Sequence, residues 1–187
     1  MDLVANNLSY KPDDQYHLNE VSFNFKEGNL YTILGRTLSG KTTLLKTIAG
    51  LLTPDSGEIE FDGKNFLKVP VWERNVAMVY QQFINYPHLN VFENIAFPLK
   101  QRKIDQSIIN EKVMDALKSV GLLGYENRKI QELSGGQQQR VSLARSLVKN
   151  AKILLLDEPL VNLDYKLREQ LRDCLLYTSP SPRDTVR

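Results

Sequence analysis

The sequence predicts an α/β fold in which a mostly parallel sheet is covered by helices on both faces. Short apolar segments typical of strands alternate along the chain with segments whose apolar residues recur at helical spacing. A glycine-bearing loop joins one apolar segment, 29–35, directly to a helical segment that begins near Lys41. Late in the chain, a buried strand with a run of apolar residues is expected within 152–159. This order of elements is typical of parallel strands joined by helices.

The first half of the chain is expected to supply most of the strands. The expected strands are 21–25 (VSFNF), 29–35 (NLYTILG), the part of 53–64 that carries Ile59 and Phe61 on one face, and 75–82 (NVAMVYQQ). One helix is expected among them over 41–52, where the apolar residues at helical spacing are Leu44, Leu45, Ile48 and Leu52.

The second half is expected to be mostly helical, from about Pro87 to Gln131 and again after Ser134. The stripe expected to face the core consists of Ile108, Ile109, Val113, Leu117 and Val120. A last helix is expected over 165–176. The expected divisions are 1–86 for the N-terminal β subdomain and phosphate-loop core, 87–140 for a helical insert, 141–176 for the end of the core, and 177–187 for a non-native tail.

Composition and charge narrow the class of protein. The 24 Lys and Arg residues nearly balance 22 Asp and Glu residues, so no broad basic surface for nucleic acid is expected. The one cysteine, Cys174, allows no internal disulfide and suits a reducing compartment. No apolar run approaches the roughly 18 residues of a membrane-spanning helix, and the N-terminus does not resemble a signal peptide. A soluble intracellular protein is expected.

The loop GRTLSGKT fits the phosphate-binding pattern G-x-x-x-x-G-K-[ST], between an apolar segment and a helix. Backbone N–H groups at a helix N-terminus attract anions, and Lys41 can reach the outer phosphates of a nucleotide. The Thr42 hydroxyl can ligate Mg²⁺. Leu38 stands where a glycine would fit more easily, and a plain glycine-rich turn is the alternative interpretation. The residues expected to contact the nucleotide are Gly35, Arg36, Thr37, Leu38, Ser39, Gly40, Lys41, Thr42 and Thr43.

The segment ILLLDEP carries Asp157 and Glu158 to the carboxyl end of a strand, where ligands of such sheets bind. Asp157 is expected to hold Mg²⁺ through water, and Glu158 to polarise the attacking water. Gln81, at the end of another expected strand, can contact the metal or the water. The predicted catalytic residues are Glu158, Gln81 and Lys41, and the predicted metal ligands are Thr42, Gln81 and Asp157. Two solvated acids capping a strand are the alternative.

The stretch LSGGQQQR is a second candidate for phosphate binding. Ser134 and Gln137 fit an S-x-x-Q capping box, which by itself explains those two residues. Gly135 and Gly136 are costly in a first helical turn unless a ligand must approach the backbone closely. Because Lys41 already serves one phosphate, we expect this helix end to face a nucleotide held by a second copy of the chain.

Taken in order, GRTLSGKTT, Gln81, LSGGQQQR, ILLLDEP and LVNLD resemble the ABC transporter ATPases. The resemblance implies a P-loop NTPase fold of the ABC ATPase type, with a mostly parallel core sheet, an N-terminal antiparallel β subdomain and a helical insert subdomain. It implies ATP and Mg²⁺ as cofactors, and ATP hydrolysis in a head-to-tail dimer. The residues that it adds are Asp164, which would report across the dimer interface, and an aromatic ring that stacks on adenine, with Tyr10 as first choice and Tyr16 as second.

Within that family, NVAMVYQQFINYPHLNVFENIAFPLK and DEPLVNLDYKLREQLR look most like ATP-binding subunits of sugar or glycerol importers, as do Leu38 and Val161. The implied partners are a second ATPase subunit, identical or paralogous, transmembrane permease subunits and, indirectly, an extracytoplasmic solute-binding protein, with no nucleic acid. The segment from Gln81 to about Phe97 would meet the permease. The chain would therefore lie at the cytoplasmic face of the cell membrane as a peripheral subunit.

The sequence departs from the family pattern near its end. The family has a switch histidine beyond Asp164, whereas this chain has only His17 and His88. The tail YTSPSPRDTVR resembles a translated sequencing-adapter read-through, and a C-terminally truncated chain is expected. Two alternatives stay open: a soluble ABC ATPase acting on DNA or ribosomes, and a nucleotide-binding fragment with little turnover. The interval from Thr43 to Leu133 is too short for the long coiled coils of chromosome-associated members.

Overall fold

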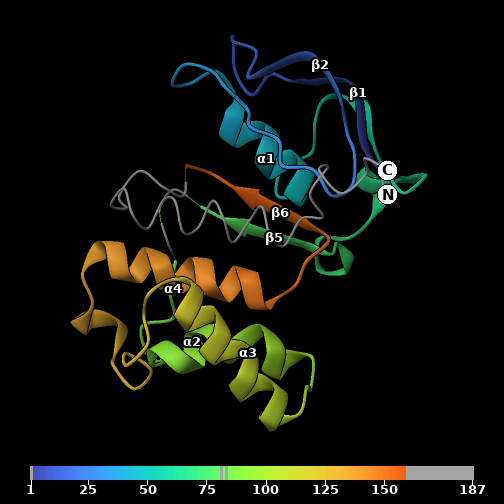
Figure 1. Cartoon of the computed structure of the whole chain (residues 1–187). Helices are drawn as coiled ribbons and strands as arrows, with labels where there is room; N and C mark the ends of the chain where they lie inside the picture. The colour runs from blue at the N-terminus through green and yellow to red at the C-terminus, as the bar shows by residue number, and fades with distance from the viewer. Residues whose placement is uncertain (1, 81, 83, 159–187) are drawn as a thin grey trace, which may run out of the picture. The chain divides into compact units, whose positions relative to one another are not determined.

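The computed structural model describes residues 2–80, 82 and 84–158 (Figure 1). These residues form two compact units, one up to Asn75 and one from Val76 onward. Neither unit contains, in its described part, a helix long and apolar enough to cross a bilayer. Gln81, Asp164, the expected helix 165–176 and the tail lie outside the described residues.

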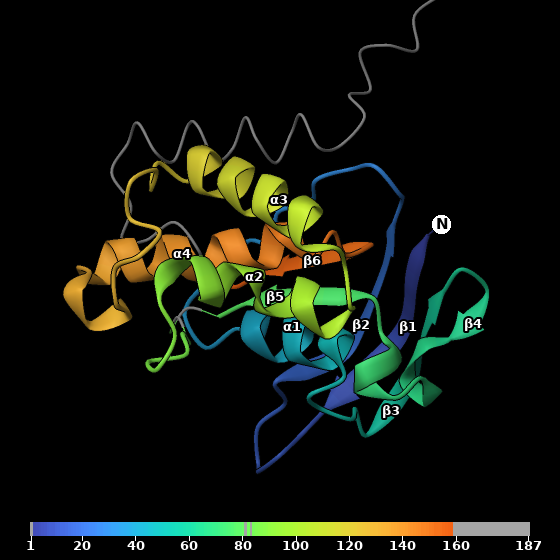
Figure 2. The same ribbon diagram turned by 90° about the horizontal axis from the view of Figure 1, so that it is seen from below.

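The first unit contains an antiparallel sheet with the strand order β2-β1-β3-β4 (Figure 2). Its strands are β1 (Leu3–Tyr10), β2 (Leu18–Phe25), β3 (Ser56–Phe61) and β4 (Lys64–Asn65). Residues on one face of the sheet are buried, among them Leu3, Ala5, Leu8 and Ile59. This sheet confirms the strands expected at 21–25 and around Ile59, and β3 turns into β4 through Gly63 at φ 71°.

The helix of the first unit, α1 (Lys41–Ala49), begins where the sequence predicts and ends three residues early. Gly50 stops it by taking the left-handed conformation, with φ 84°. The buried Arg74 then holds the helix end, because its Nη1 donates to the Ile48 carbonyl at 2.9 Å and its Nε donates to the Val69 carbonyl at 2.9 Å. Burial lowers the pKa of Arg74. A cation at a helix C-terminus is favoured by the helix dipole.

The strand expected at 29–35 does not form in the described part of the chain, so this prediction is wrong there. Leu34 is 87% exposed, and Leu30 and Tyr31 are also exposed. Tyr31 stacks on Phe25, with ring centroids 4.4 Å apart, and its hydroxyl accepts a hydrogen bond from the Lys26 N–H at 2.9 Å. An apolar run becomes a strand only when another strand satisfies its backbone groups, and none of the described strands pairs with it.

The second unit combines a parallel strand pair with three helices. The pair is β5 (Val76–Val79) and β6 (Ile153–Leu156), in register from Val76 opposite Ile153 to Val79 opposite Leu156. The helices are α2 (Val91–Gln101), α3 (Gln106–Ser119) and α4 (Gly135–Val148), which contact one another pairwise (Figure 2). These elements confirm the strands expected within 75–82 and 152–159 and the helix expected after Ser134. Three short 3-10 helices complete the described structure: η1 (Phe66–Lys68), η2 (Val71–Glu73) and η3 (Ile130–Glu132).

One member of the predicted apolar stripe of α3 is misplaced. Ile109 is 2% exposed and lies in the core, whereas its neighbour Ile108 is 41% exposed. Consecutive residues of an α-helix are about 100° apart around the axis, so the two isoleucines cannot both face the core fully. Val113, Leu117 and Val120 are buried as predicted.

Candidate functional site

The phosphate loop in the first unit folds around the amino group of Lys41. Its Nζ donates to the carbonyl oxygens of Gly35 at 3.0 Å and Arg36 at 2.8 Å. The loop is tightened by a hydrogen bond from the Ser39 N–H to the Arg36 carbonyl at 3.1 Å. Both acceptors of the amino group are neutral, so these bonds fix the ammonium without neutralising its charge. A cation presented in this way suits an anionic ligand.

Gly40 is the N-cap of α1, with φ 87°, and it brings no side chain to the helix end. A Cβ built on this residue would lie 2.0 Å from the His17 carbonyl oxygen and 3.4 Å from a Leu18 methyl group. Only glycine therefore fits between the loop and the start of β2. The positive end of α1 and the Lys41 ammonium together meet the requirements of a phosphate group.

Leu38 lies at the tip of the loop, where it is 97% exposed and has φ 66°. This left-handed conformation is one that glycine adopts without a steric penalty, whereas other L-residues pay about 1–2 kcal/mol. The structure thus gives the physical reason why a glycine would fit this position more easily. The contact roles predicted for Leu38 and its loop neighbours Thr37 and Ser39 stay predictions.

The two aromatic candidates for adenine stacking lie in different surroundings. Tyr10 ends β1 and is half-buried; its ring meets that of His17 edge-on at 6.1 Å between centroids. Tyr16 is 57% exposed, with the Lys11 amino group 5.2 Å from the centre of its ring. Tyr10 therefore contacts His17, whose carbonyl oxygen lies against Gly40 of the phosphate loop. This contact favours Tyr10 over Tyr16 as the adenine-stacking residue.

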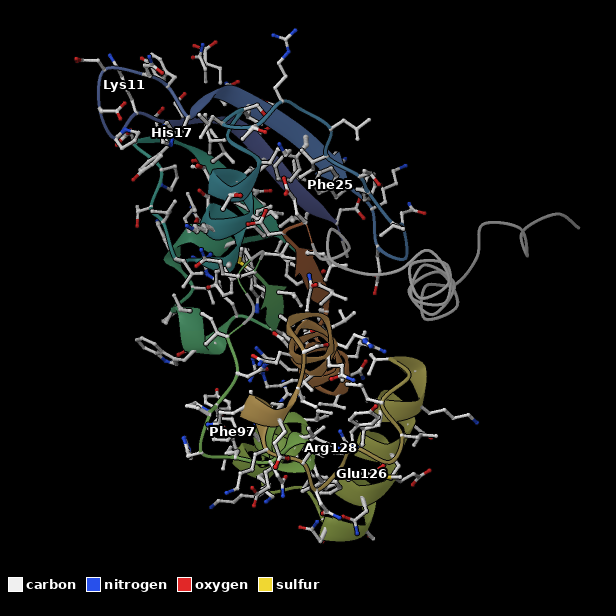
Figure 3. All side chains as sticks on the ribbon, turned by 90° about the vertical axis from the view of Figure 1, so that its left-hand side faces the viewer. Lys11, His17, Phe25, Phe97, Glu126 and Arg128 are labelled. Atoms are coloured by element: carbon white, nitrogen blue, oxygen red, sulfur yellow. The ribbon has the colours of Figure 1, made fainter. Side chains whose placement is uncertain are left out.

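His17 is a residue that sequence reasoning passed over. It precedes β2 in the loop after β1 (Figure 3). Its ring Nδ1 lies 3.5 Å from the Thr43 hydroxyl, and its backbone N–H donates to the Tyr10 carbonyl at 2.9 Å. The sequence offered one signal: a histidine between a predicted adenine-stacking tyrosine and an alternating strand. Its contact with Thr43 joins residues distant in sequence, and local patterns do not report such contacts.

The two predicted acids at the end of β6 differ in environment. Asp157 is 5% exposed, and its backbone N–H donates to the Val79 carbonyl at 2.9 Å, which extends the parallel pair by one residue. Glu158 is exposed, with φ 48°. The strand thus carries one buried and one exposed carboxylate at its carboxyl end, where the sequence predicts a metal ligand followed by a base. These roles, and that of Gln81, stay predictions.

The stretch LSGGQQQR begins α4 with the capping box that the sequence predicts. The Ser134 hydroxyl accepts from the Gln137 N–H at 3.3 Å, and the Gln137 side-chain oxygen accepts from the Ser134 N–H at 2.9 Å. Gly135 is exposed and Gly136 is half-buried in the first helical turn. The cap therefore accounts for the serine and the glutamine, while the two glycines leave the first two positions of the helix without side chains.

The second unit also contains a groove of about 250 Å³ beside the C-terminal half of α2. Its lining includes Met78, Tyr86, Phe97, Pro98, Arg145 and Lys149. The Arg145 guanidinium lies 4.9 Å from the centre of the Tyr86 ring, and the Lys149 amino group donates to the Val76 carbonyl at 2.5 Å. Burial lowers the pKa of Arg145, and burial together with the charge of Arg102 lowers that of Lys149.

Asn94 holds the segment 86–89, which carries Tyr86 of this groove. Asn94 was not among the functional residues predicted from the sequence. The side chain is fully buried in α2, and its Oδ1 accepts from the Tyr86 N–H at 2.8 Å. Its Nδ2 donates to the carbonyls of Tyr86 at 3.0 Å and Leu89 at 3.1 Å. One amide thus holds both ends of the short segment 86–89, which carries Tyr86 at the groove.

Comparison with known proteins identifies the class to which this fold and these motifs belong. The family model described as ABC transporter matches residues 18–161, and the chain is a member of that family. The chain is similar to a solved structure described as a dimeric post-hydrolysis state of the ATP-binding cassette MJ0796 bound to ADP and Pi. The TM-score is 0.84 with 31% sequence identity, over 96% of this chain and 85% of that one. A second dimeric structure of MJ0796, described as a bacterial ABC transporter cassette, also gives a TM-score of 0.84 with 31% identity, over 95% and 84% of the two chains. These similarities confirm the fold class predicted from the sequence.

Among curated relatives, the chain is similar to the spermidine/putrescine import ATP-binding protein PotA. It is 48% identical to PotA of Mycoplasma capricolum subsp. capricolum over 171 residues, which cover 91% of this chain and 49% of that protein. It is 48% identical to PotA of Acetivibrio thermocellus over 166 residues, which cover 89% of this chain and 47% of that protein. The chain spans about half the length of the curated relatives it matches. The predicted likeness to import ATPases is confirmed, whereas the predicted sugar or glycerol branch is not.

Proposed function

We propose that this chain is the ATP-binding and ATP-hydrolysing subunit of an importer for polyamines such as spermidine or putrescine. The observation that carries the proposal is the phosphate loop, in which Gly40 opens α1 and the Lys41 ammonium is held at the loop carbonyls. The identity of about half of the aligned residues to import ATP-binding proteins named for spermidine and putrescine supports the cargo. A carbohydrate or glycerol cargo, expected from the sequence, has no such support among these relatives.

The nucleotide phosphates are proposed to bind at the N-terminus of α1, where the helix dipole and Lys41 attract negative charge. Thr42, Asp157 and Gln81 would hold Mg²⁺, which neutralises charge on the phosphate oxygens when bound. Hydroxyl, carboxylate and amide oxygens are the ligand types that this hard cation prefers. The low exposure of Asp157 at the end of β6 is in keeping with a metal ligand.

Hydrolysis is proposed to take place between two subunits arranged head to tail. Glu158 would orient and polarise the attacking water, with Gln81 beside it, and Lys41 would stabilise the charge on the transferred phosphate. The start of α4 in the second subunit, at Ser134, Gly135, Gly136 and Gln137, would contact the same nucleotide, and Asp164 would lie at the interface. The dimeric state in which MJ0796 is described, bound to ADP and Pi, supports a dimer as the active form.

The groove beside α2 is the proposed contact for a permease subunit. It lies next to the segment that follows Gln81, and it combines the apolar side chains of Phe97 and Pro98 with the cations Arg145 and Lys149. Such a lining suits an amphipathic helix from a membrane subunit. The chain would then act at the cytoplasmic face of the membrane, with a solute-binding protein on the other side.

The test is ATP hydrolysis by this subunit assembled with its permeases and solute-binding protein in liposomes. We expect spermidine to stimulate hydrolysis several-fold, while maltose and glycerol 3-phosphate do not. Lys41→Ala should lower the stimulated rate by about 10² or more, because an electrostatic contact to the reacting phosphate is lost.

The matched control is Lys46→Ala, which removes a half-buried lysine from the last turn of the same helix. It should leave the stimulated rate within about twofold, because Lys46 lies at the opposite end of α1 from the phosphate loop. Stimulation by maltose rather than spermidine would contradict the cargo, and unchanged hydrolysis by Lys41→Ala would contradict the phosphate-loop assignment.

A further inference from the structure

His17 occupies a position between two parts of the proposed nucleotide site. Its imidazole meets the Tyr10 ring edge-on at 6.1 Å, and its Nδ1 lies 3.5 Å from the Thr43 hydroxyl. Tyr10 ends β1, and Thr43 is the third residue of α1. The imidazole is therefore placed between the proposed base-stacking ring and the helix that receives the phosphates.

The main chain of His17 is held firmly on both sides. Its N–H donates to the Tyr10 carbonyl at 2.9 Å, and its carbonyl oxygen lies so close to Gly40 that no Cβ fits there. Leu18, the next residue, is buried as the first residue of β2. The sheet and the phosphate loop together therefore fix the backbone that carries the exposed imidazole.

The order of groups in a nucleoside triphosphate determines which part of it His17 can reach. Lys41 is proposed to hold the outer phosphates and Tyr10 the base, so the ribose lies between them. An imidazole can both donate and accept hydrogen bonds, and a ribose hydroxyl can do the same. A hydrogen bond between them is therefore possible with either tautomer of the ring.

We propose that His17 is a nucleotide-binding residue whose imidazole hydrogen-bonds a ribose hydroxyl. The inference rests on the proposed function, because it takes ATP as the ligand of the phosphate loop. It adds a recognition element for the sugar to the contacts of the base and the phosphates. The site would then distinguish a ribonucleotide from an analogue that lacks the ribose hydroxyls.

The experiment compares binding of three ligands by calorimetry in the presence of Mg²⁺: ATP, 2′,3′-dideoxy-ATP and inorganic tripolyphosphate. We expect the unsubstituted chain to bind ATP about fivefold more tightly than the dideoxy analogue, which is the size of one net hydrogen bond. His17→Ala should weaken ATP binding by about the same factor, remove the preference for ATP over the dideoxy analogue, and leave tripolyphosphate binding unchanged. His17→Gln, which keeps a hydrogen-bonding side chain, should recover part of the loss.

Gln15→Ala, in the same exposed loop, is the matched control and should bind all three ligands as the unsubstituted chain does. Unchanged ATP binding by His17→Ala would overturn the inference. Equal weakening of ATP and tripolyphosphate would also overturn it, because the substitution would then act on the phosphate end. If the unsubstituted chain bound neither ATP nor tripolyphosphate, the proposed function would fail together with the inference.

Discussion

The N-termini of α1 and α4 both carry glycines within a motif predicted to bind phosphate, yet only α4 has a side-chain cap for its backbone N–H groups. At α4, Ser134 and Gln137 exchange two hydrogen bonds between their side chains and backbone N–H groups. At α1, the N-cap is Gly40, which has no side chain, and the Lys41 ammonium is held at the loop carbonyls of Gly35 and Arg36. One helix end is capped by its own side chains, and the other has no side-chain cap.

This difference suggests a separate role in nucleotide binding for each helix N-terminus. A helix end that keeps its own cap is stable without a ligand, and it can contact a phosphate only with the groups outside the capping box. An end that begins with glycine beside a lysine gains more from an anion. We therefore expect α1 to hold the nucleotide in each subunit, and α4 to meet a nucleotide that is already bound to the other subunit.

The largest effect on stability and on ATP binding is expected from adding a side chain at the N-terminus of α1. Gly40→Ala would put a Cβ 2.0 Å from the His17 carbonyl oxygen at a residue with φ 87°. Steric overlap and the left-handed conformation should together cost about 2–5 kcal/mol of unfolding free energy. ATP binding should be lost as well, because the loop must move away from β2. Urea unfolding and calorimetry measure the two effects.

The control is Gly63→Ala, in the β3–β4 hairpin. Gly63 also has a positive φ, 71°, but a Cβ built there meets no atom within 4 Å. Only the conformational cost of about 1–2 kcal/mol should appear, and ATP binding should be unchanged. If both variants lost the same stability, the close packing of the phosphate loop on His17 would be refuted.

A smaller effect is expected at the N-terminus of α4, where substitutions of Ser134 distinguish a capping role from a phosphate-contact role. Ser134→Ala should cost about 1 kcal/mol of unfolding free energy, since the cap of α4 is lost. Ser134→Asp should keep the cap and preserve stability, because aspartate is a good N-cap. Its carboxylate should nevertheless repel the nucleotide of the other subunit and lower ATP hydrolysis by the assembled transporter about tenfold or more.

The comparison with Ser134→Ala makes the test specific. If hydrolysis followed stability, falling for Ser134→Ala and not for Ser134→Asp, the start of α4 would be a structural cap with no phosphate contact. The opposite pattern would support the composite site.

The capping box of α4 could be predicted from sequence because its two members lie three residues apart, and the hydrogen bonds between them are local. The start of α1 at Lys41 and the position of Asp157 directly after the strand of four apolar residues follow from similarly short patterns. The phosphate loop and the acidic strand end, which are the chemical parts of the proposed site, belong to this class of local features.

The features that sequence reasoning missed depend on contacts between distant residues. The run 29–35 has the composition of a buried strand, but its state is decided by whether another strand pairs with it. His17 gains its place from Gly40 and Thr43, and Arg74 gains its burial from the carbonyls at the end of α1. Asn94 likewise holds backbone groups that precede its helix. None of these partners is marked by a spacing rule.

The smallest effect is expected at the tip of the phosphate loop. Leu38→Gly removes a side chain that is 97% exposed from a backbone with φ 66°. The relief of the left-handed strain is about 1–2 kcal/mol, and the greater freedom of glycine in the unfolded chain offsets roughly half of it. A net gain in unfolding free energy of about 0.5–1 kcal/mol should follow in urea, with ATP affinity unchanged. A net loss would mean that the leucine side chain contributes contacts that outweigh its backbone strain, and the loop tip would then be part of the stable structure.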